Sequence, residues 1–302
     1  MLFVLCAGAG LLAVLTLVDL AYQLINNASP AISRFGLGFL VHEAWQPNFF
    51  KFGVAALIYG TLVSSAMALL LAAPLGISIG LYLAMMAPPR VRAVVGPLVE
   101  MLAAVPSIIY GFWGVLVLAP FILHLEPGLH SALGFIPLFG PPQTTGISVF
   151  TAGIVLTIMI LPIVSALTRD LFLTVPSELK DGAAALGATR WEVIRGIVLP
   201  STLSGVSAAL VLALGRALGE AIAVSLVIGD VGQIHASLFN PGSTLAERIA
   251  NQFTSPVNSL HIAAMFYAGL VLLVIGLLTS LGARAIAGRF DVERAYARAV
   301  AI

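Results

Sequence analysis

Long apolar runs separated by short polar segments dominate the chain, and this pattern predicts transmembrane helices. A helix needs roughly 20 residues to cross a bilayer core of about 30 Å. Runs of about that length or more lie near 2–25, 56–86, 94–123, 147–168, 200–228 and 261–285. Three of them exceed one span, so we expect tilts, or bends at Pro74 and Pro106. The pattern therefore predicts an all-α, polytopic membrane protein with about six transmembrane helices.

The segment 176–200 is polar, yet its residues predict two short helices rather than a loop. The first helix is expected to begin at Pro176 or Ser177 and to end at Gly187, which suits the left-handed residue after a helix. Thr189 and Glu192 have the spacing of a capping box, in which each side chain satisfies a free amide of the other residue. The second helix should therefore begin directly after Thr189.

Leu199-Pro200 is expected to end this second helix, because proline removes a donor and disfavours helix before it. Both helices carry apolar stripes at helical spacing. The stripes are Leu179, Ala183 and Leu186 in the first helix and Trp191, Ile194 and Val198 in the second. Either the stripes dock a partner or the segment lies as a connector on lipid headgroups.

The composition excludes a soluble domain. The chain has 302 residues, of which 60% are hydrophobic and only 9% are charged, and the mean hydropathy is +1.08. The single cysteine, Cys6, lies in an apolar run, so neither an internal disulfide nor a cysteine metal cluster is expected.

Basic residues are distributed unevenly over the two sides that six spans define. If both termini are cytoplasmic, the inner segments hold Arg90, Arg92, Arg169, Lys180, Arg190, Arg195, Arg284, Arg289, Arg294 and Arg298, and the outer loops hold Arg34, Lys51 and Arg248. This asymmetry predicts cytoplasmic termini and places 176–200 in the cytoplasm.

The N-terminus reads as a first transmembrane helix rather than a secretory signal, because no basic residues precede the apolar run. Asp19 is expected near the outer end of this helix, within reach of the interface. We divide the chain into a first helix with its outer loop at 1–50, a transmembrane core at 51–290 and a cytoplasmic tail at 291–302.

Turn-forming residues fill two outer loops, 124–146 and 229–260, which we therefore expect to be irregular and exposed. Every histidine falls on or beside this outer side. These residues are His42, His124, His130, His235 and His261. Their spacing matches no known zinc pattern, so no metal site is predicted.

Two charges inside the fifth run suggest a function. Arg216 and Glu220 are four residues apart, which would place them on one helical face, with Arg216 near the middle of the run. Such residues usually face a bundle interior or a wet cavity. Either the pair neutralises itself as a structural element, or the guanidinium lines an anion pathway, where it can bind two oxygens of an oxyanion. Glu100 lies about 12 Å from the centre of its own run at 1.5 Å per residue, on the inner side.

No catalytic machinery is apparent. The two lysines, Lys51 and Lys180, do not follow a phosphate-binding glycine pattern, so any ATP-driven step requires a separate chain. No nucleophile and base arrangement is visible either. The chain is therefore predicted not to be an enzyme and to carry no cofactor of its own.

The segment 176–200 resembles the EAA loop of permeases from binding-protein-dependent ABC importers. The motif reads E-A-A, three residues, G, nine residues, I, one residue and L-P. Its positions here are Asp181, Gly182, Ala183, Gly187, Ile197, Leu199 and Pro200. Asp181 and Gly182 depart from the motif but keep an acid and a small residue. The resemblance implies the MetI-like ABC permease fold, with coupling helices, including Trp191, that dock on an ATPase.

Three further stretches are similar to permeases of phosphate-specific ABC importers, most of all to their C-type subunit. They are 58–63, 102–114 and 215–220. The resemblance implies a heterodimer with a homologous A-type permease, two ATPase subunits that bind ATP and Mg, and a periplasmic or extracellular phosphate-binding protein. It also implies the cytoplasmic membrane of a prokaryote, no nucleic-acid partner, and a pathway role for Arg216 and Glu220.

Two other functions remain open at this stage. A permease for another oxyanion, such as molybdate or sulfate, would share the EAA loop. An ATP-independent anion transporter or channel would leave the apolar stripes of 176–200 without a partner.

Overall fold

The computed structural model describes residues 2–287, and this part of the chain is helical apart from turns, loops and one isolated β-bridge. The helices are α1 (Leu2–Phe35), α2 (Gly38–Val41), α3 (Ala55–Leu81), α4 (Pro89–Ala103), α5 (Ser107–Trp113), α6 (Ala119–Leu133), α7 (Val149–Thr174), α8 (Ser177–Ala185), α9 (Arg190–Val193), α10 (Leu199–Gly219), α11 (Ile222–Val227), α12 (Leu245–Gln252) and α13 (Ser259–Ala287). A short 3₁₀ helix spans Pro47–Phe49.

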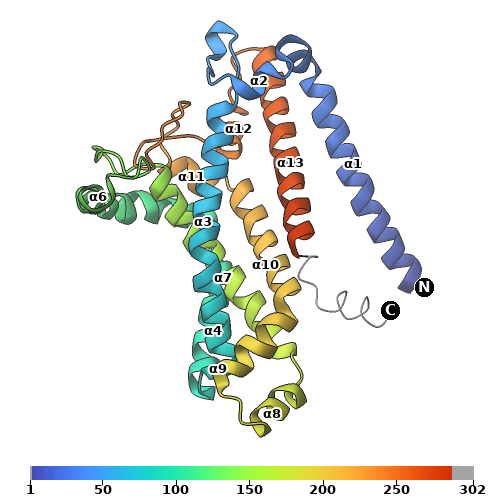
Figure 1. Ribbon diagram of the computed structural model, residues 1–302. Coiled ribbons are helices and arrows are strands. Elements are labelled where there is room, and N and C mark those ends of the chain that lie inside the picture. Colours follow the sequence, from blue (N-terminus) through green and yellow to red (C-terminus); the bar gives the residue numbers. More distant parts are fainter. Residues whose placement is uncertain (1, 288–302) are drawn as a thin grey trace.

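Six segments of the described chain are long and apolar enough to cross a membrane, which confirms the predicted number. They are Phe3–Phe35, Ala55–Met86, Ser107–Leu133, Val149–Thr174, Arg190–Gly219 and Ser259–Ala285. In Figure 1, α8 and α9 lie at one end of the bundle, and α2 and α12 lie at the other. We call these the α8 end and the α12 end.

Helix α7 is the central element, because its side chains are buried by neighbours along most of its length. It packs against α3 through small residues. An added Cβ at Gly76 would lie 2.7 Å from Cγ1 of Val164, and one at Gly80 would lie 2.9 Å from the backbone nitrogen of Arg169. The glycines of α3 therefore allow the two backbones to approach closely.

A second packed region joins α1, α2 and α13 at the α12 end. Phe39 stacks on Tyr267 with ring centroids 4.3 Å apart, and Ala28 and Ala31 of α1 are fully buried there. This packing carries α1 to Phe35, past the predicted end near residue 25. Asp19 consequently lies at the middle of the helix, so its predicted position near the outer end is wrong.

Proline effects differ from those predicted. A π-helical turn lies two residues before each of three prolines, and these turns span Tyr82–Met86, Gly114–Leu118 and Ile194–Val198. In the last turn, the Leu199 amide donates to the carbonyl of Ile194, and the helix continues through Pro200 into α10. The prediction that Leu199-Pro200 ends the helix is wrong, because the wide turn accommodates the proline ring.

Pro106 breaks its helix rather than bending it. Helix α4 ends at Ala103 and α5 begins at Ser107, so the predicted run 94–123 is divided between two helices. The Tyr110 hydroxyl donates to the carbonyl of Leu102 at 2.7 Å and joins the two helices across the break.

The two loops at the α12 end are more ordered than expected. Helix α6 extends through Pro127 to Leu133, and α12 forms within 229–260. Glu126 is buried, and its carboxylate accepts from the Gln143 amide of the following loop at 2.7 Å. Residues 242–248 are all buried as well. The prediction of irregular, exposed loops is therefore wrong for these parts. The predicted tail, 291–302, lies outside the described residues.

Candidate functional site

The α8 end presents a helix pair with defined caps at both sides of its corner. Gly187 has φ +89°, its amide donates to Ala184 O at 3.0 Å, and the Ala188 amide donates to Ala183 O at 3.1 Å. These two bonds form a Schellman motif. The predicted capping box is present, with Thr189 N donating to a Glu192 carboxylate oxygen at 2.7 Å. Local sequence alone therefore fixes this corner.

Only some of the apolar side chains of this helix pair are exposed to a partner. Leu186 is 92% exposed, Leu179 is 52% exposed and Trp191 is 62% exposed. Ile194 and Val198 are instead buried against the chain's own helices, so the predicted second stripe does not form a docking face. Of the residues predicted for coupling, Asp181, Gly182, Gly187, Trp191 and Pro200 are exposed, whereas Ala183, Ile197 and Leu199 are half-buried.

Arg216 and Glu220 do not share a helical face, which corrects the sequence prediction. Helix α10 ends at Gly219, and Glu220 is extended, with φ −72° and ψ 121°. The Glu220 carboxylate accepts a hydrogen bond from the Ala223 amide at 3.1 Å, near the start of α11. Arg216 lies in the last turn of α10 rather than at the middle of the span. The sequence gives only a weak signal for this break. Gly219 precedes Glu220, whose side chain can accept a hydrogen bond from an amide at the start of the next helix.

Arg216 projects from an open helix face. Leu212, Gly215 and Gly219 share this face at helical spacing, and all are exposed. Among residues 2–287, no carboxylate forms an ion pair with Arg216. The guanidinium lies within electrostatic range of the Tyr110 hydroxyl, so the breaks before α5 and before α11 lie close to the same charge. Non-helical backbone at membrane depth is tolerated where it is buried in protein or lines a wet cavity.

Glu100 belongs to a different site. Its carboxylate lies 2.8 Å from Nη1 of Arg169. The other terminal nitrogen of Arg169, Nη2, lies 2.8 Å from the Asp170 carboxylate. The ion pair between Glu100 and Arg169 links α4 to α7. The structure therefore does not bring Glu100 to Arg216.

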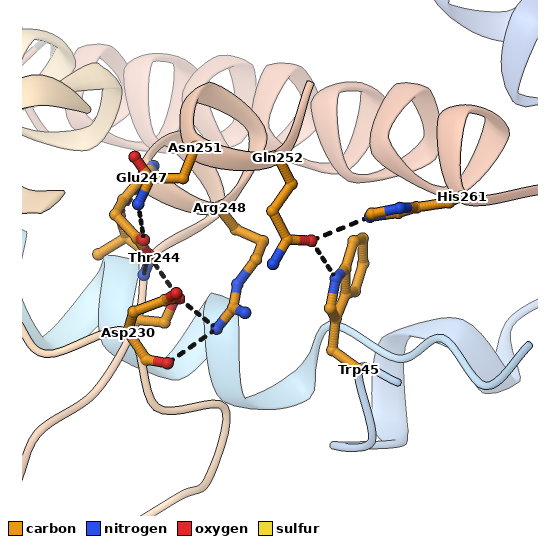
Figure 2. A network of polar contacts seen from close by, with 9 residues as sticks. Trp45, Asp230, Thr244, Glu247, Arg248, Asn251, Gln252 and His261 are labelled. Carbon is orange, nitrogen blue, oxygen red and sulfur yellow. Dashed lines mark hydrogen bonds and ion pairs between the residues drawn. The ribbon is translucent and has the colours of Figure 1, made fainter. Parts of the chain in front are cut away.

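A buried polar network at the α12 end was not found from the sequence (Figure 2). Arg248 forms an ion pair with Asp230 at 2.8 Å, and its side chain is only 8% exposed. Glu247 is fully buried and accepts from the Asn251 amide at 2.7 Å and from the Ser243 hydroxyl. Burial raises the pKa of Glu247 to about 7, and the Ser243 hydrogen bond opposes this shift. Thr244 and Glu247 have the spacing of a capping box, and this spacing could have predicted the start of α12 from the sequence.

The network connects α12 to several elements. The Leu245 amide donates to the Thr61 hydroxyl of α3 at 2.9 Å. Gln252 accepts from the indole of Trp45 at 2.8 Å and from Nε2 of His261 at 2.9 Å. A hollow of about 540 Å³ lies beside these groups, and Glu43, Trp45, Asp230 and Arg248 are among its lining residues. Residues 2–287 contain no cluster of three histidine, cysteine or carboxylate side chains arranged for a metal ion.

The family follows from comparison with known proteins. Residues 76–292 match the family described as the binding-protein-dependent transport system inner membrane component. This match covers more than half of the chain, so the chain belongs to that family.

Particular relatives are more specific. The chain is 44% identical over 292 residues to the phosphate transport system permease protein PstC of Mesorhizobium japonicum, covering 95% of this chain and 89% of the relative. It is 42% identical to PstC of Pasteurella multocida, covering 86% and 82%. It is 39% identical to a probable PstC of Methanocaldococcus jannaschii, covering 84% and 82%.

Solved structures support the fold. A bacterial alginate ABC transporter in complex with a periplasmic protein matches with a TM-score of 0.63 at 17% identity, over 95% of both chains. The MetNI methionine ABC transporter in an inward-facing form matches with a TM-score of 0.57 at 19% identity, over 78% of this chain and 95% of that chain. These neighbours confirm the ABC permease fold.

Proposed function

We propose that this chain is a permease subunit of an ATP-driven importer of inorganic phosphate. It forms the translocation pathway together with a second, homologous permease subunit of the A type. Identities of 39–44% to phosphate permeases support the substrate class. The structural observation that carries the proposal is Arg216, an exposed cation on a membrane helix that has no carboxylate partner among the described residues.

Arg216 supplies the chemistry that phosphate requires. A guanidinium is planar and donates two parallel hydrogen bonds to two oxygens of a tetrahedral anion. The last turn of α10 contributes the negative end of the helix dipole, and Glu220 follows directly, so the positive field at this site is moderated. A moderated cation binds the passing anion weakly and releases it. Glu100 is paired with Arg169 apart from this site, so we leave it out of the proposed route.

The α8 end transmits the motion of the ATPase. Two ATPase subunits bind ATP and Mg, while this chain contributes Leu179, Leu186 and Trp191 as the exposed apolar contacts of its coupling helices. Gly187 sets the angle between α8 and α9, so it determines how both present themselves to the ATPase. The alternative given above, a connector that lies on lipid headgroups, requires no such defined corner.

The orientation follows from the basic residues. We place α8 in the cytoplasm and α12 outside, with both termini cytoplasmic, in the cytoplasmic membrane of a prokaryote. The outer phosphate-binding protein then docks at the α12 end. Glu43, Trp45, Asp230 and Arg248 line the hollow there, and they offer an aromatic group beside charges of both signs.

The test is ATP hydrolysis by the purified complex of both permeases and the ATPase in lipid vesicles. The phosphate-binding protein loaded with phosphate should stimulate hydrolysis several-fold over the empty binding protein. Sulfate and molybdate, each with the same binding protein, should give no stimulation. Stimulation by either of these anions and not by phosphate would reassign the substrate, and hydrolysis that does not respond to the loaded binding protein would contradict coupled import.

A further inference from the structure

A pocket of about 250 Å³ lies between α8, α9 and the π-helical turn that follows α3. We call it the α8 pocket. Its apolar lining includes Met85 and Met86 from the π-helical turn and the buried side chain of Ile194. A single ordered water needs only about 10–15 Å³ of such space, so the α8 pocket has room for a larger chemical group.

The charged side chains that line the α8 pocket are both basic. They are Lys180 of α8 and Arg190 of α9. Neither forms an ion pair with a carboxylate among residues 2–287. The acidic residues of α8, Glu178 and Asp181, are not among the lining residues. The α8 pocket therefore offers two cations to an anionic group, and both kinds of side chain bind phosphate.

The α8 pocket lies on a different side of α8 from the apolar contacts proposed for the ATPase. Lys180 and Ala184 line the pocket and are one helical turn apart. At 100° per residue, their common direction lies about 130° around the helix from that of Leu179 and Leu186. An ATPase that contacts the exposed leucines consequently leaves the α8 pocket to another occupant.

The α8 pocket lies at the level of the lipid headgroups. The candidate span Ala55–Met86 ends in its wall, and the candidate span Arg190–Gly219 begins there. These spans contain 32 and 30 residues, which correspond to about 48 and about 45 Å of helix. A bilayer is about 40–45 Å thick when the headgroup layers are included. The ends of both spans therefore reach the headgroup layer.

The apolar wall of the α8 pocket is held in place by a further basic residue. The guanidinium of Arg92 donates to the carbonyl of Ala84 at 2.9 Å. Arg92 belongs to α4, so this bond ties α4 to the π-helical turn Tyr82–Met86 that carries both methionines. Methionine side chains are flexible and polarizable, so they pack well against irregular apolar groups.

We infer that the α8 pocket binds an anionic phospholipid of the inner leaflet. The lipid phosphate lies between Lys180 and Arg190, and the glycerol and the first part of the acyl chains pack on Met85 and Met86. Basic pockets on the cytoplasmic side of membrane helices suit anionic headgroups, and the apolar wall favours a lipid over a free phosphate ion. The inference rests on the proposed cytoplasmic placement of α8, but it does not depend on phosphate as the transported substrate.

Photolabelling of the whole complex tests the location. The complex of both permeases and the ATPase is placed in phosphatidylcholine vesicles with a small fraction of phosphatidylglycerol that carries a photoreactive group beside its glycerol backbone. Adducts should form on Tyr82–Met86, and excess unlabelled phosphatidylglycerol should suppress them. No adducts on this turn, or equal suppression by excess phosphatidylcholine, would overturn the inference. Suppression by inorganic phosphate would also overturn it, because the site would then take the free ion.

Charge variants test the headgroup contacts. Lys180→Gln and Arg190→Gln should each reduce the adducts several-fold, whereas Arg190→Lys should retain most of them. Arg195→Gln is the matched control, because Arg195 is also basic and exposed at the α8 end but does not line the α8 pocket. Labelling is normalised to assembled complex. Equal labelling of Arg190→Gln and Arg195→Gln would overturn the inference. Labelling requires no transport, so a complex that fails to respond to phosphate should still be labelled.

Discussion

Glu220 accepts a hydrogen bond from the backbone amide of Ala223 at 3.1 Å, across the break between α10 and α11. The carboxylate therefore satisfies one of the free amides at the start of α11, as a capping side chain does. It does not form an ion pair with Arg216. We propose that Arg216 is therefore available to a passing anion, while the Glu220 side chain is held at the break.

Replacing Glu220 separates its structural role from its electrostatic role. Glu220→Gln keeps an oxygen that accepts from Ala223, so we expect unchanged membrane abundance. It removes a charge near Arg216, so the initial rate of phosphate uptake should change. Glu220→Ala, as the control, loses the acceptor and should lower abundance as well. Equal losses of abundance and uptake in Glu220→Gln would instead favour a self-neutralising structural pair.

Gly187 tests coupling at the α8 end. Its φ of +89° is poorly accessible to β-branched residues. Gly187→Val should therefore displace α9 relative to α8 and reduce ATPase recovered with the complex, while the protein still inserts. Gly187→Asn is the matched control, because asparagine tolerates left-handed backbone and no other group lies within 4 Å of an added Cβ. Wild-type assembly and transport by Gly187→Val would show that the corner is not used for coupling.

Gly80 tests the packing of α3 on α7. A Cβ at this position would collide with the Thr168 hydroxyl and lie 2.9 Å from the Arg169 backbone nitrogen. Gly80→Ala should destabilise the fold by about 1–3 kcal/mol, in the range for an overpacked core. Gly276→Ala in α13 meets no group within 4 Å and should be neutral. Thermal unfolding of the detergent-purified variants compares them, and equal midpoints would contradict the close approach of the two helices.

Stability at the α12 end should depend on pH through Glu247. Its folded pKa is about 7, above its ordinary value of 4.5, because burial disfavours the charge. Between these two values the folded state keeps a proton that the unfolded state has lost. The stability that this group contributes is therefore full below the lower pKa and decreases as pH rises toward the upper one.

Hydrogen exchange of the α12 amides measures this dependence. After correction for intrinsic rates, opening should become easier as pH rises from about 5 to about 7 and then level off. Glu247→Gln keeps the hydrogen-bonding shape without the ionisation, so its profile should be flat. The same slope in the variant would assign the effect to another group.

The sequence predicted features that depend on local chemistry or on simple hydrophobicity. Six spans follow from apolar runs. The corner at Gly187 and the box formed by Thr189 and Glu192 follow from positions near one another in the chain. The spans are decided by continuous apolar runs, and the corner and the capping box are decided by residues a few positions apart. Tertiary packing did not override any of these features.

Other features depend on packing between distant segments. The continuation of the helix through Pro200 requires a π-helical turn, which no residue pattern predicts directly. Ile194 and Val198 read as a docking stripe, but the chain's own helices cover them. The ion pair of Arg248 with Asp230 joins residues 18 positions apart through a folded loop, so only the structure reveals it.

The central claim is that Arg216 contacts phosphate on its way through the membrane. Radiolabelled phosphate uptake into vesicles that contain the whole complex, normalised to assembled protein, measures this most directly. Arg216→Lys keeps the charge but loses the planar fork, so assembly and basal ATP hydrolysis should hold while uptake falls strongly. Arg216→Gln lacks charge and fork and should lose uptake more completely. Near-normal uptake by both variants would contradict the account and leave Arg216 as a structural charge.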